Sequence, residues 1–563
     1  MSGSYELNHT GEVVLNRGLK DANNDVTEME VDPKNNEYDE EQSLNIEDTF
    51  DPDSGVKRQL KDRHISLLAL GGIIGPGCLI GAGNALAIGG PLALLLGFGI
   101  IGILAFIMME SIGEMITLYP SGGGFTTLTR RFHSDALSAV CGYAYAVVFF
   151  AVLANEYNTL SSIMQFWGPQ VPLYGYILMF WAAFQVFQLL GVGAFGESEY
   201  WLAWFKILGL VTYYIFSIVY ISGGVKNRPA FGFQYWNDPG ALSNGFKGVA
   251  NVFVFCSTFY SGTESVALAA TESKNPRRAV PIAIRQTFWR ILIVYLGISI
   301  FYGVTVPYND ENLNSATKVL KSPIAIAISR AGWPAGVHLV NAFILITCIS
   351  AINGSLYIGS RTLTHLANEG LAPKLLAWTD RRGVPIPAIT VFNALGLISL
   401  MNVSVTAVDA YNYIVNLSGV GVFIVWGIIS LTHLRFRKAW KLQGHTRDEL
   451  PYKAKLFPFF PIVSIIANIF LGLVQGWSYF KPFDAKNFVD AYILIPAGII
   501  LYLGVSYWKT KDFFTAVDLS EVNLLFGQRL PTISHDMPSS TDSTTSIVIT
   551  KTPRKINWKD ILT

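Results

Sequence analysis

The chain has 563 residues, of which 51% are hydrophobic, 13% aromatic and only 14% charged. Soluble domains carry about 25% charged residues, so this composition indicates a protein with many membrane-spanning segments. The formal net charge of +1 predicts no nucleic-acid partner. The four cysteines lie within apolar stretches, and the sequence contains no nucleotide-binding or nucleophile motif. We therefore expect no metal, no cofactor and no enzymatic activity.

Both ends of the chain are polar. Residues 1–60 contain few apolar side chains and a dense acidic stretch, which predicts a disordered tail. Residues 509–563 are also polar and contain a Ser/Thr run, so a second disordered tail is predicted there. Lys20 and Lys34 are expected to be accessible in the first tail, and the ubiquitin machinery is an expected partner of these tails.

Twelve apolar segments lie between the tails, and about 20 apolar residues are enough to cross a hydrocarbon core of about 30 Å. The segments are 65–87, 91–117, 137–164, 171–192, 200–222, 246–268, 287–306, 336–366, 385–402, 409–433, 457–479 and 489–508. Lys and Arg residues gather in every second loop and beside both tails, as in Arg130 and Arg131. The positive-inside rule then predicts that both termini are cytosolic.

The first apolar segment contains several glycines and a proline, which are poor residues for a helix interior. One interpretation is a helix unwound near Gly75–Cys78, whose free backbone groups receive a ligand. Its positive helix end would favour an anionic group such as a carboxylate. The alternative is a glycine-rich face that packs against another helix.

A second interruption lies in the sixth segment, where Phe259–Glu264 places a glycine, hydroxyl groups and a carboxylate inside an apolar helix. Five segments separate the two interruptions, so residues 61–222 and 223–435 would be two five-helix halves of opposite topology. Helices 11 and 12 would follow within residues 436–508. Paired interruptions at matching positions indicate a transporter site near the bilayer midplane.

Several motifs together resemble the fungal amino-acid permeases of the amino acid–polyamine–organocation superfamily. These motifs are Gly71–Gly77, Glu110–Glu114 with Tyr119–Phe125, Glu156 followed by Trp167, Gly196–Glu197 with Lys206, Phe259–Glu264, Glu272 with Pro276 and Pro281, and Asn353–Ala372. The match runs in order through residues 57–510. The sequence is most similar to the general, low-affinity permeases of this family.

The resemblance implies an all-α polytopic membrane protein of twelve transmembrane helices. Its fold would be leucine-transporter-like, a five-plus-five inverted repeat with broken helices 1 and 6. It also implies import of amino acids driven by a proton gradient across the plasma membrane, so amino acids, protons and the lipid bilayer are the expected partners. The residues that it assigns to substrate are Ile74, Gly75, Gly77, Cys78, Glu156, Ser257, Phe259, Tyr260, Thr263 and Asn353.

Within this set, the amides of Gly77 and Cys78 would bind the substrate carboxylate. Carbonyl groups near Ile74, Ser257 and Tyr260 would bind the α-amino group. Tyr260 matches the aromatic residue that closes over the substrate in relatives.

Pro76 departs from the family pattern, since relatives commonly place Ser or Thr between the two glycines. Proline supplies neither a hydroxyl nor an amide, and a lost charge-assisted hydrogen bond costs about 1.5–3 kcal/mol. The sequence therefore predicts weak substrate binding, unless Pro76 pre-sets the unwound geometry.

Charges inside apolar segments are functional candidates, because each costs about 2.5–3.5 kcal/mol at the bilayer centre. Lys206 matches a lysine whose ammonium replaces a sodium ion in proton-coupled relatives; the alternative is a lysine that snorkels to the interface. Glu156 is predicted to carry protons or to select a substrate side chain, against the alternative of a structural carboxyl group.

Four further polar residues have a structural or gating interpretation. Glu264 is predicted to tie the interrupted sixth helix to its neighbours. Glu110 and Glu114 are predicted to pair with basic loops such as Arg130 and Arg131. Asn353 either lines the site or packs between helices.

Two other functions remain open from sequence alone. A nutrient receptor with this fold would bind amino acids and signal without transporting them. An exchanger, or a permease for polyamines or purines, would share the same fold.

Overall fold

The computed structural model describes residues 6–7, 13–14, 74–120, 124–226, 228–265, 276–313, 322–403, 407–480, 482–525 and 527–528. The chain divides into two compact units, Met1–Glu47 and Asp48–Thr563. In the first unit, strands β1 (Glu6–Leu7) and β2 (Val13–Val14) pair in antiparallel fashion. The predicted disorder of residues 1–60 otherwise concerns residues outside the described part. The second unit contains the candidate site.

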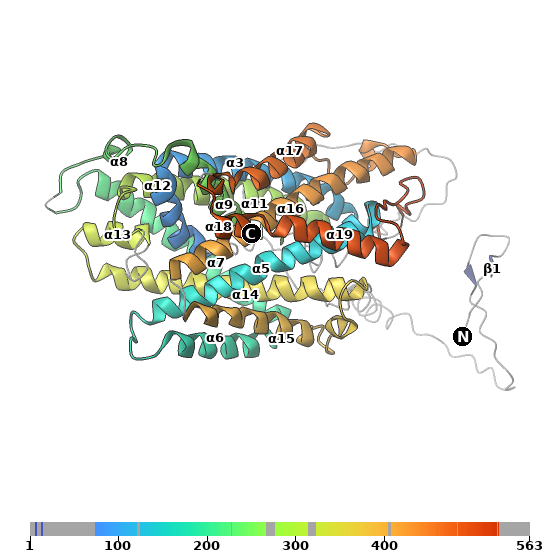
Figure 1. Cartoon of the computed structure of the whole chain (residues 1–563), viewed down its shortest axis with the longest axis horizontal. Helices are drawn as coiled ribbons and strands as arrows, with labels where there is room; N and C mark the ends of the chain where they lie inside the picture. The colour runs from blue at the N-terminus through green and yellow to red at the C-terminus, as the bar shows by residue number, and fades with distance from the viewer. Residues whose placement is uncertain are drawn as a thin grey trace, which may run out of the picture. The chain divides into compact units, whose positions relative to one another are not determined.

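The second unit is built from helices (Figure 1). The α-helices are α3 (Ala82–Leu118), α4 (Phe125–Phe132), α5 (Asp135–Met164), α6 (Leu173–Gln188), α7 (Val192–Ile221), α8 (Gln234–Asn237), α9 (Gly245–Tyr260), α11 (Pro276–Arg290), α12 (Gly297–Thr305), α13 (Pro323–Arg330), α14 (Gly336–Asn368), α15 (Ile386–Leu395), α16 (Ala407–Leu442), α17 (Phe459–Val474), α18 (Ala485–Tyr492) and α19 (Leu494–Thr510). Short π and 3₁₀ segments are η2 (Gly77–Gly81), η3 (Ile291–Leu296), η4 (Lys374–Ala377), η5 (Gly396–Val403), η6 (Arg447–Glu449) and η7 (Trp477–Tyr479).

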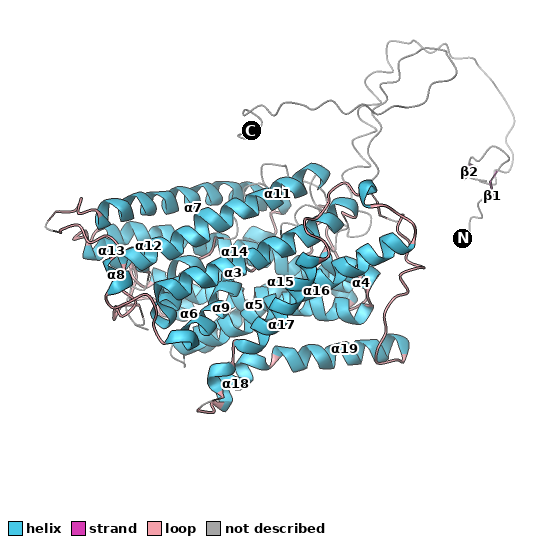
Figure 2. Ribbon diagram, turned by 90° about the horizontal axis from the view of Figure 1, so that it is seen from above, coloured by secondary structure: helices cyan, strands magenta, loops and turns pink. Residues whose placement is uncertain are grey.

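The long helices run side by side in the second unit (Figure 2). Helix α5 packs against α14, α16 and α19, while α3 packs against α9. Helices α7 and α19 lie on opposite faces of this bundle in Figure 2. The interior helices α5, α14 and α16 therefore have few ways to expose a polar group to solvent, and most polar groups on them are expected to form hydrogen bonds inside the bundle.

Among the described residues, seven helices are long and apolar enough to cross a membrane, or eight if the bent pair α18 and α19 is one span. Two of the shorter predicted spans correspond to the apolar helices Leu173–Gln188 and Ile386–Met401, and the predicted sixth span contains α9. The number of twelve spans stays a prediction. The chain is thus a helical membrane protein whose long helices lie where apolar segments were predicted, whereas the short helices α4, α8 and α13 lie between those segments.

The predicted first two spans form one helical run, Gly77–Leu118, that is broken at Gly90. Gly90 has φ +83°, and a Cβ there would lie 2.7 Å from the Ala241 oxygen. The amide of Leu92 donates to Ala241 O (2.9 Å), and that of Ser243 donates to Gly89 O (2.9 Å). Only glycine fits this tight turn, which directs the chain from the first predicted span into the second.

The two predicted helix interruptions are described in part. The first described residue before η2 is Ile74, and the chain is helical from Pro76 onward. Helix α9 ends at Tyr260, and Gly262 follows with φ +90°. Residues 57–73 and 266–275 lie outside the described part. The broken-helix geometry at both places stays a prediction.

The C-terminal strap, residues 511–525, differs from the expectation of a disordered tail from residue 509. Its amide at Val517 donates to His133 O (2.7 Å), and its carbonyl there accepts from Arg435 (2.8 Å). Tyr119 donates to Leu524 O (2.8 Å), and Leu524 is buried. The strap docks through backbone amide and carbonyl groups, and a polar side-chain composition does not reveal that kind of contact.

Candidate functional site

A cavity of about 90 Å³ lies inside the bundle, well above the ~10–15 Å³ that one water needs. Five residues predicted to contact substrate line it: Gly75, Gly77, Cys78, Glu156 and Phe259. The other polar side chains on its wall are those of Asn155, Thr258, Ser261, Ser265, Ser355, Tyr357 and Ser418. The cavity is therefore bounded by the start of the first helical run, by α5, by the end of α9, by α14 and by α16.

The start of the first helical run is shaped by glycine and proline. A Cβ at Gly77 would lie 2.7 Å from Cδ1 of Phe259, so only glycine allows this approach. Pro76 precedes η2 with φ −64°, at a helix start, where a missing amide is best tolerated. The amide of Cys78 donates to Gly75 O (3.2 Å), and Ile74 is fully buried beside this turn. The backbone here is compact, and one of the two amides predicted to bind a carboxylate, that of Cys78, is used within the turn.

The end of α9 places an aromatic ring at the cavity, but the ring is that of Phe259. Tyr260 instead donates its hydroxyl to Phe98 O (3.0 Å) and packs on Tyr295, with ring centroids 3.8 Å apart. Successive helical residues point in directions about 100° apart, so only one of these neighbours can face the cavity. The expectation that Tyr260 closes over substrate therefore differs from this arrangement.

Three other predicted substrate residues lie next to the cavity without lining it. Ser257 donates to Val254 O (2.8 Å), and Thr263 donates to Tyr260 O (2.7 Å). Asn353 uses its side chain in bonds between helices. All three therefore hold the backbone and helices that form the cavity wall.

A cluster of buried charges lies beside the cavity. Lys206 on α7 has no exposed surface, which excludes a snorkelling position within this bundle. Its ammonium lies within electrostatic range of the carboxylates of Glu156 and Glu199. Glu156 on α5 is 4% exposed, and its Oε2 has no hydrogen-bond partner among the described residues. The cluster thus joins one lysine to two carboxyl groups, one of which lines the cavity.

Glu199 on α7 is the member of this cluster that sequence reasoning missed. Ser350 donates to its Oε2 (2.5 Å), and Asn353 donates to its Oε1 (2.9 Å). Gln188 then donates to Asn353 Oδ1 (2.7 Å). The sequence spacing could have revealed Glu199, because it lies seven residues before Lys206 and residues seven apart share one helix face.

Arg290 is a second residue that the sequence reasoning did not single out. It lies at the end of α11, has no exposed surface and donates to Thr263 Oγ1. Its guanidinium lies 6.0 Å from the Tyr295 ring centroid. A buried arginine next to the turn after α9 places a fixed positive charge behind the cavity wall, and its position inside the predicted span 287–306 could have revealed it.

Glu264 joins the turn after α9 to α16. Its Oε1 accepts from the amide of Gly262 (2.9 Å), and its Oε2 accepts from Trp426 Nε1 (2.9 Å). Trp426 and Glu264 are both buried. These are the contacts that a positional role for Glu264 requires.

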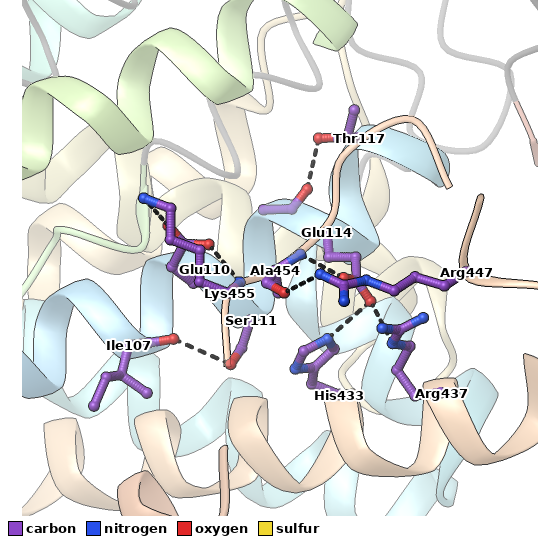
Figure 3. A network of polar contacts seen from close by, with 11 residues as sticks. Ile107, Glu110, Ser111, Glu114, Thr117, His433, Arg437, Arg447, Ala454 and Lys455 are labelled. Atoms are coloured by element: carbon purple, nitrogen blue, oxygen red, sulfur yellow. Dashed lines mark hydrogen bonds and ion pairs between the residues drawn. The ribbon is translucent and has the colours of Figure 1, made fainter. Parts of the chain in front are cut away.

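Glu110 and Glu114 on α3 hold the loop between α16 and α17 (Figure 3). Glu114 Oε1 contacts His433 (3.1 Å) and Arg437 (3.0 Å), while its Oε2 accepts from the amide of Ala454 (2.6 Å). Glu110 accepts from the amide of Lys455 (3.1 Å) and lies 3.6 Å from its ammonium. We give the name α3 clasp to Glu110 and Glu114 together with the residues that they contact on α16 and on the loop after it.

The partners of the α3 clasp differ from the predicted Arg130 and Arg131. Arg130 instead pairs with Asp135 (2.5 Å), and Arg131 lies over the ring of Tyr119 (4.1 Å). Both arginines belong to α4, whereas the clasp is closed by α16 and the loop after it. Sequence proximity suggested the wrong basic segment, because the contacting residue His433 lies 319 residues after Glu114.

No group of three or more metal-ligating side chains occurs within the described ranges. The geometry instead combines helices of membrane-spanning length, a small internal cavity with polar groups and a buried charge cluster. These features define a membrane carrier for a small polar solute.

Comparison with known proteins identifies the family. Residues 64–515 match the model of the amino acid permease family. The chain is 79% identical to the general amino acid permease AGP3 of Saccharomyces cerevisiae over 85% of this chain and 86% of that protein. It is 47% identical to an uncharacterized amino-acid permease of Schizosaccharomyces pombe, over 87% and 90% of the two chains. It is 34% identical to the general amino-acid permease GAP1 of Saccharomyces cerevisiae, over 90% and 85%.

The chain belongs to the amino acid permease family. It is a fungal amino-acid permease, a multi-pass membrane transporter and not an enzyme.

Proposed function

We propose that this permease imports L-amino acids of several kinds across the plasma membrane by proton symport. The names of two relatives, AGP3 and GAP1, describe general amino-acid permeases, which supports a broad range of substrates. The cavity walls support the same conclusion, because among the described residues they carry hydroxyl groups, apolar surface and a single acidic side chain, Glu156. A strict selector for one charged side chain would need more groups of opposite charge at the cavity.

The buried charge cluster is the single observation that carries the proton-coupling proposal. If Lys206, Glu156 and Glu199 were all ionised, the cluster would hold a net negative charge inside the bundle, which is costly. One bound proton removes that charge. Both oxygens of Glu199 already accept hydrogen bonds, so its ionised form is satisfied. Glu156 has an oxygen without a partner among the described residues, and we assign the exchangeable proton to it.

The position of Glu156 connects proton binding to substrate binding. Its carboxyl group lines the cavity, and Lys206 lies behind it on α7. Protonation of Glu156 leaves Lys206 and Glu199 as a balanced pair, and the cavity then receives a zwitterionic amino acid without a net charge. Release of the proton on the other side restores the attraction between Glu156 and Lys206. The two charge states would thus favour different access states of the cavity.

We further propose that access alternates between two inverted halves, residues 61–222 and 223–435, with α17 to α19 outside them. The clustering of basic residues at one end of the bundle supports cytosolic termini. Arg130, Arg131, Arg435 and Lys509 belong to elements that contact one another there. Attachment of ubiquitin to the tails, including Lys20 and Lys34, stays a prediction for residues outside the described part.

The test is uptake of a panel of labelled amino acids in permease-deficient fungal cells at external pH 4.5 and 7.5. Several amino acids should enter, each faster at pH 4.5. Uptake that is the same at both pH values would indicate exchange or facilitated diffusion and would contradict proton symport. Surface-located protein that transports nothing would indicate an amino-acid receptor and would contradict import altogether.

A further inference from the structure

A second, larger cavity lies between α4, the start of α5, the end of α19 and the C-terminal strap. Its volume is about 760 Å³. We name it the α4–α19 cavity. It is separate from the central cavity, because the two have no lining residue in common.

The walls of the α4–α19 cavity are positively charged. Arg130, Arg131 and Lys509 line it, with Asp135 as the acidic residue on its wall. Asp135 is already paired with Arg130 (2.5 Å). Arg131 donates to the backbone oxygen of Asn523, and no carboxylate pairs with Arg131 or Lys509 within the described part of the chain. Arg131 and Lys509 therefore give the wall two positive charges that have no carboxylate partner among the described residues.

The start of α5 adds to this field. Ser134 and Asp135 both line the cavity, and the hydroxyl of Ser134 accepts from the amide of Leu137 (3.2 Å) as the N-terminal cap. The 30-residue helix α5 thus directs its positive end toward the cavity. A phosphate group is the kind of anion that arginine, lysine and a helix start bind together.

The surroundings of the cavity are those of a membrane–water interface. Trp508 at the end of α19 is 62% exposed, and Phe514 in the C-terminal strap is 80% exposed, close in sequence to Lys509 and Lys511. Aromatic and basic residues at the end of an apolar helix are typical of the headgroup level of a bilayer. Ile500, on α19 itself, is 70% exposed and offers an apolar surface for acyl chains.

From these observations we propose that the α4–α19 cavity binds the headgroup of an anionic phospholipid. The phosphate lies against Arg131 and Lys509, and the acyl chains follow the exposed apolar face of α19. A free phosphate would use the same charges but would leave that face without a role. The bound lipid joins α4, α19 and the C-terminal strap, and so stabilises this end of the bundle. The proposal does not depend on which amino acids the permease transports.

The experiment measures thermal unfolding of the purified full-length protein in a neutral detergent. Dioctanoyl phosphatidylserine should raise the melting temperature by about 2–4 °C at a concentration well above its Kd. Dioctanoyl phosphatidylcholine at the same concentration should raise it much less. Equal effects of the two lipids would overturn the proposal. An equal effect of inorganic phosphate would replace the lipid by a free anion.

Two variants locate the effect. Lys509→Glu reverses an exposed charge in the cavity and should remove most of the shift caused by phosphatidylserine. Lys441→Glu reverses an exposed charge of α16 outside the cavity lining and should keep it. A full shift in Lys509→Glu would overturn the proposal. If Lys509→Glu is not monodisperse, the milder Lys509→Gln replaces it. Native mass spectrometry then measures how much anionic lipid stays bound, and Lys509→Gln should retain less than the wild-type protein. Equal retention would overturn the proposal.

Discussion

The α3 clasp and the cluster beside the central cavity both bury carboxylates of membrane-spanning helices, but they treat them differently. In the clasp, Glu114 contacts His433, Arg437 and a backbone amide, and both of its oxygens are used. In the cluster, Glu156 faces a cavity and keeps one oxygen without a partner among the described residues. The comparison shows that burial alone does not identify a functional acid. Glu110 Oε1 in the clasp also lacks a hydrogen bond among the described residues, but it lies 3.6 Å from the Lys455 ammonium. What distinguishes Glu156 is that its unpartnered carboxyl group lines a cavity.

The clasp should be structural, and its removal should have the largest effect. Glu114→Ala leaves Arg437 without its buried counter-charge and His433 without its hydrogen-bond partner, which costs about 3–5 kcal/mol. We expect loss of folded protein at the cell surface and of a single peak in size-exclusion chromatography. Lys455→Gln is the matched control, because its ammonium is largely exposed and its pair with Glu110 contributes about 0–1 kcal/mol. A Glu114→Ala protein as stable as wild type would remove the contrast between the two regions.

Pro76 tests the region of the central cavity. A substitution there should change the affinity for substrate and leave the stability of the protein unchanged. Pro76→Thr restores an amide and a hydroxyl at the start of the first helical run. The apparent affinity for substrate should rise about ten- to a hundredfold. Pro76→Ala restores the amide alone and should give part of that gain. An unchanged or weaker affinity in Pro76→Thr, measured as KM for uptake, would contradict this prediction.

Glu199 tests whether the charges of the cluster act together. Glu199→Gln keeps the shape that contacts Ser350 and Asn353 but removes one negative charge. Lys206 then attracts Glu156 alone and opposes its protonation. The pH of half-maximal uptake should therefore fall by about one unit. Glu199→Asp keeps the charge and should keep the profile. A half-maximal pH that stays constant or rises in Glu199→Gln would contradict the coupling.

The smallest expected effect is on the pH dependence of stability and comes from His133, whose backbone oxygen binds the C-terminal strap. Burial, and secondarily Arg435, lower the pKa of His133 to about 4, whereas an unfolded histidine titrates near 6.5. The unfolded chain binds the proton more readily, so this contribution to stability is complete above pH 6.5 and is lost as the pH falls toward 4. His133→Gln should reduce the acid-induced fall in melting temperature by on the order of 1 °C. A fall identical to that of wild type between pH 7 and pH 5 would contradict this account.

The positions of the helices could be predicted from sequence because apolar length alone selects them. The turn at Gly90 lies between two predicted spans, and α9 ends at Tyr260 within the predicted interruption. Gly75, Gly77 and Glu156 were also found, because glycine and charge are rare and conspicuous in a membrane helix. Such signals are local, and a single sequence contains them in full.

The contacts between distant elements could not be predicted in the same way. The choice between Phe259 and Tyr260 depends on the rotation of α9 about its axis, which hydropathy does not determine. The partners of Glu114 lie on α16 and the loop that follows, and nothing local to α3 distinguishes them from Arg130. The strap binds through backbone amide and carbonyl groups, which do not depend on the side chain. These features depend on packing and not on residue type.

The most direct test of the proton-coupling proposal is luminal acidification in proteoliposomes that contain the purified permease. The amino acid that enters cells fastest is added outside, and a trapped pH-sensitive dye reports proton entry. We expect acidification that follows amino-acid addition, and its loss in Lys206→Met and Glu156→Gln. Amino-acid entry without acidification, or a Lys206→Met protein with full pH dependence, would contradict proton symport through this cluster.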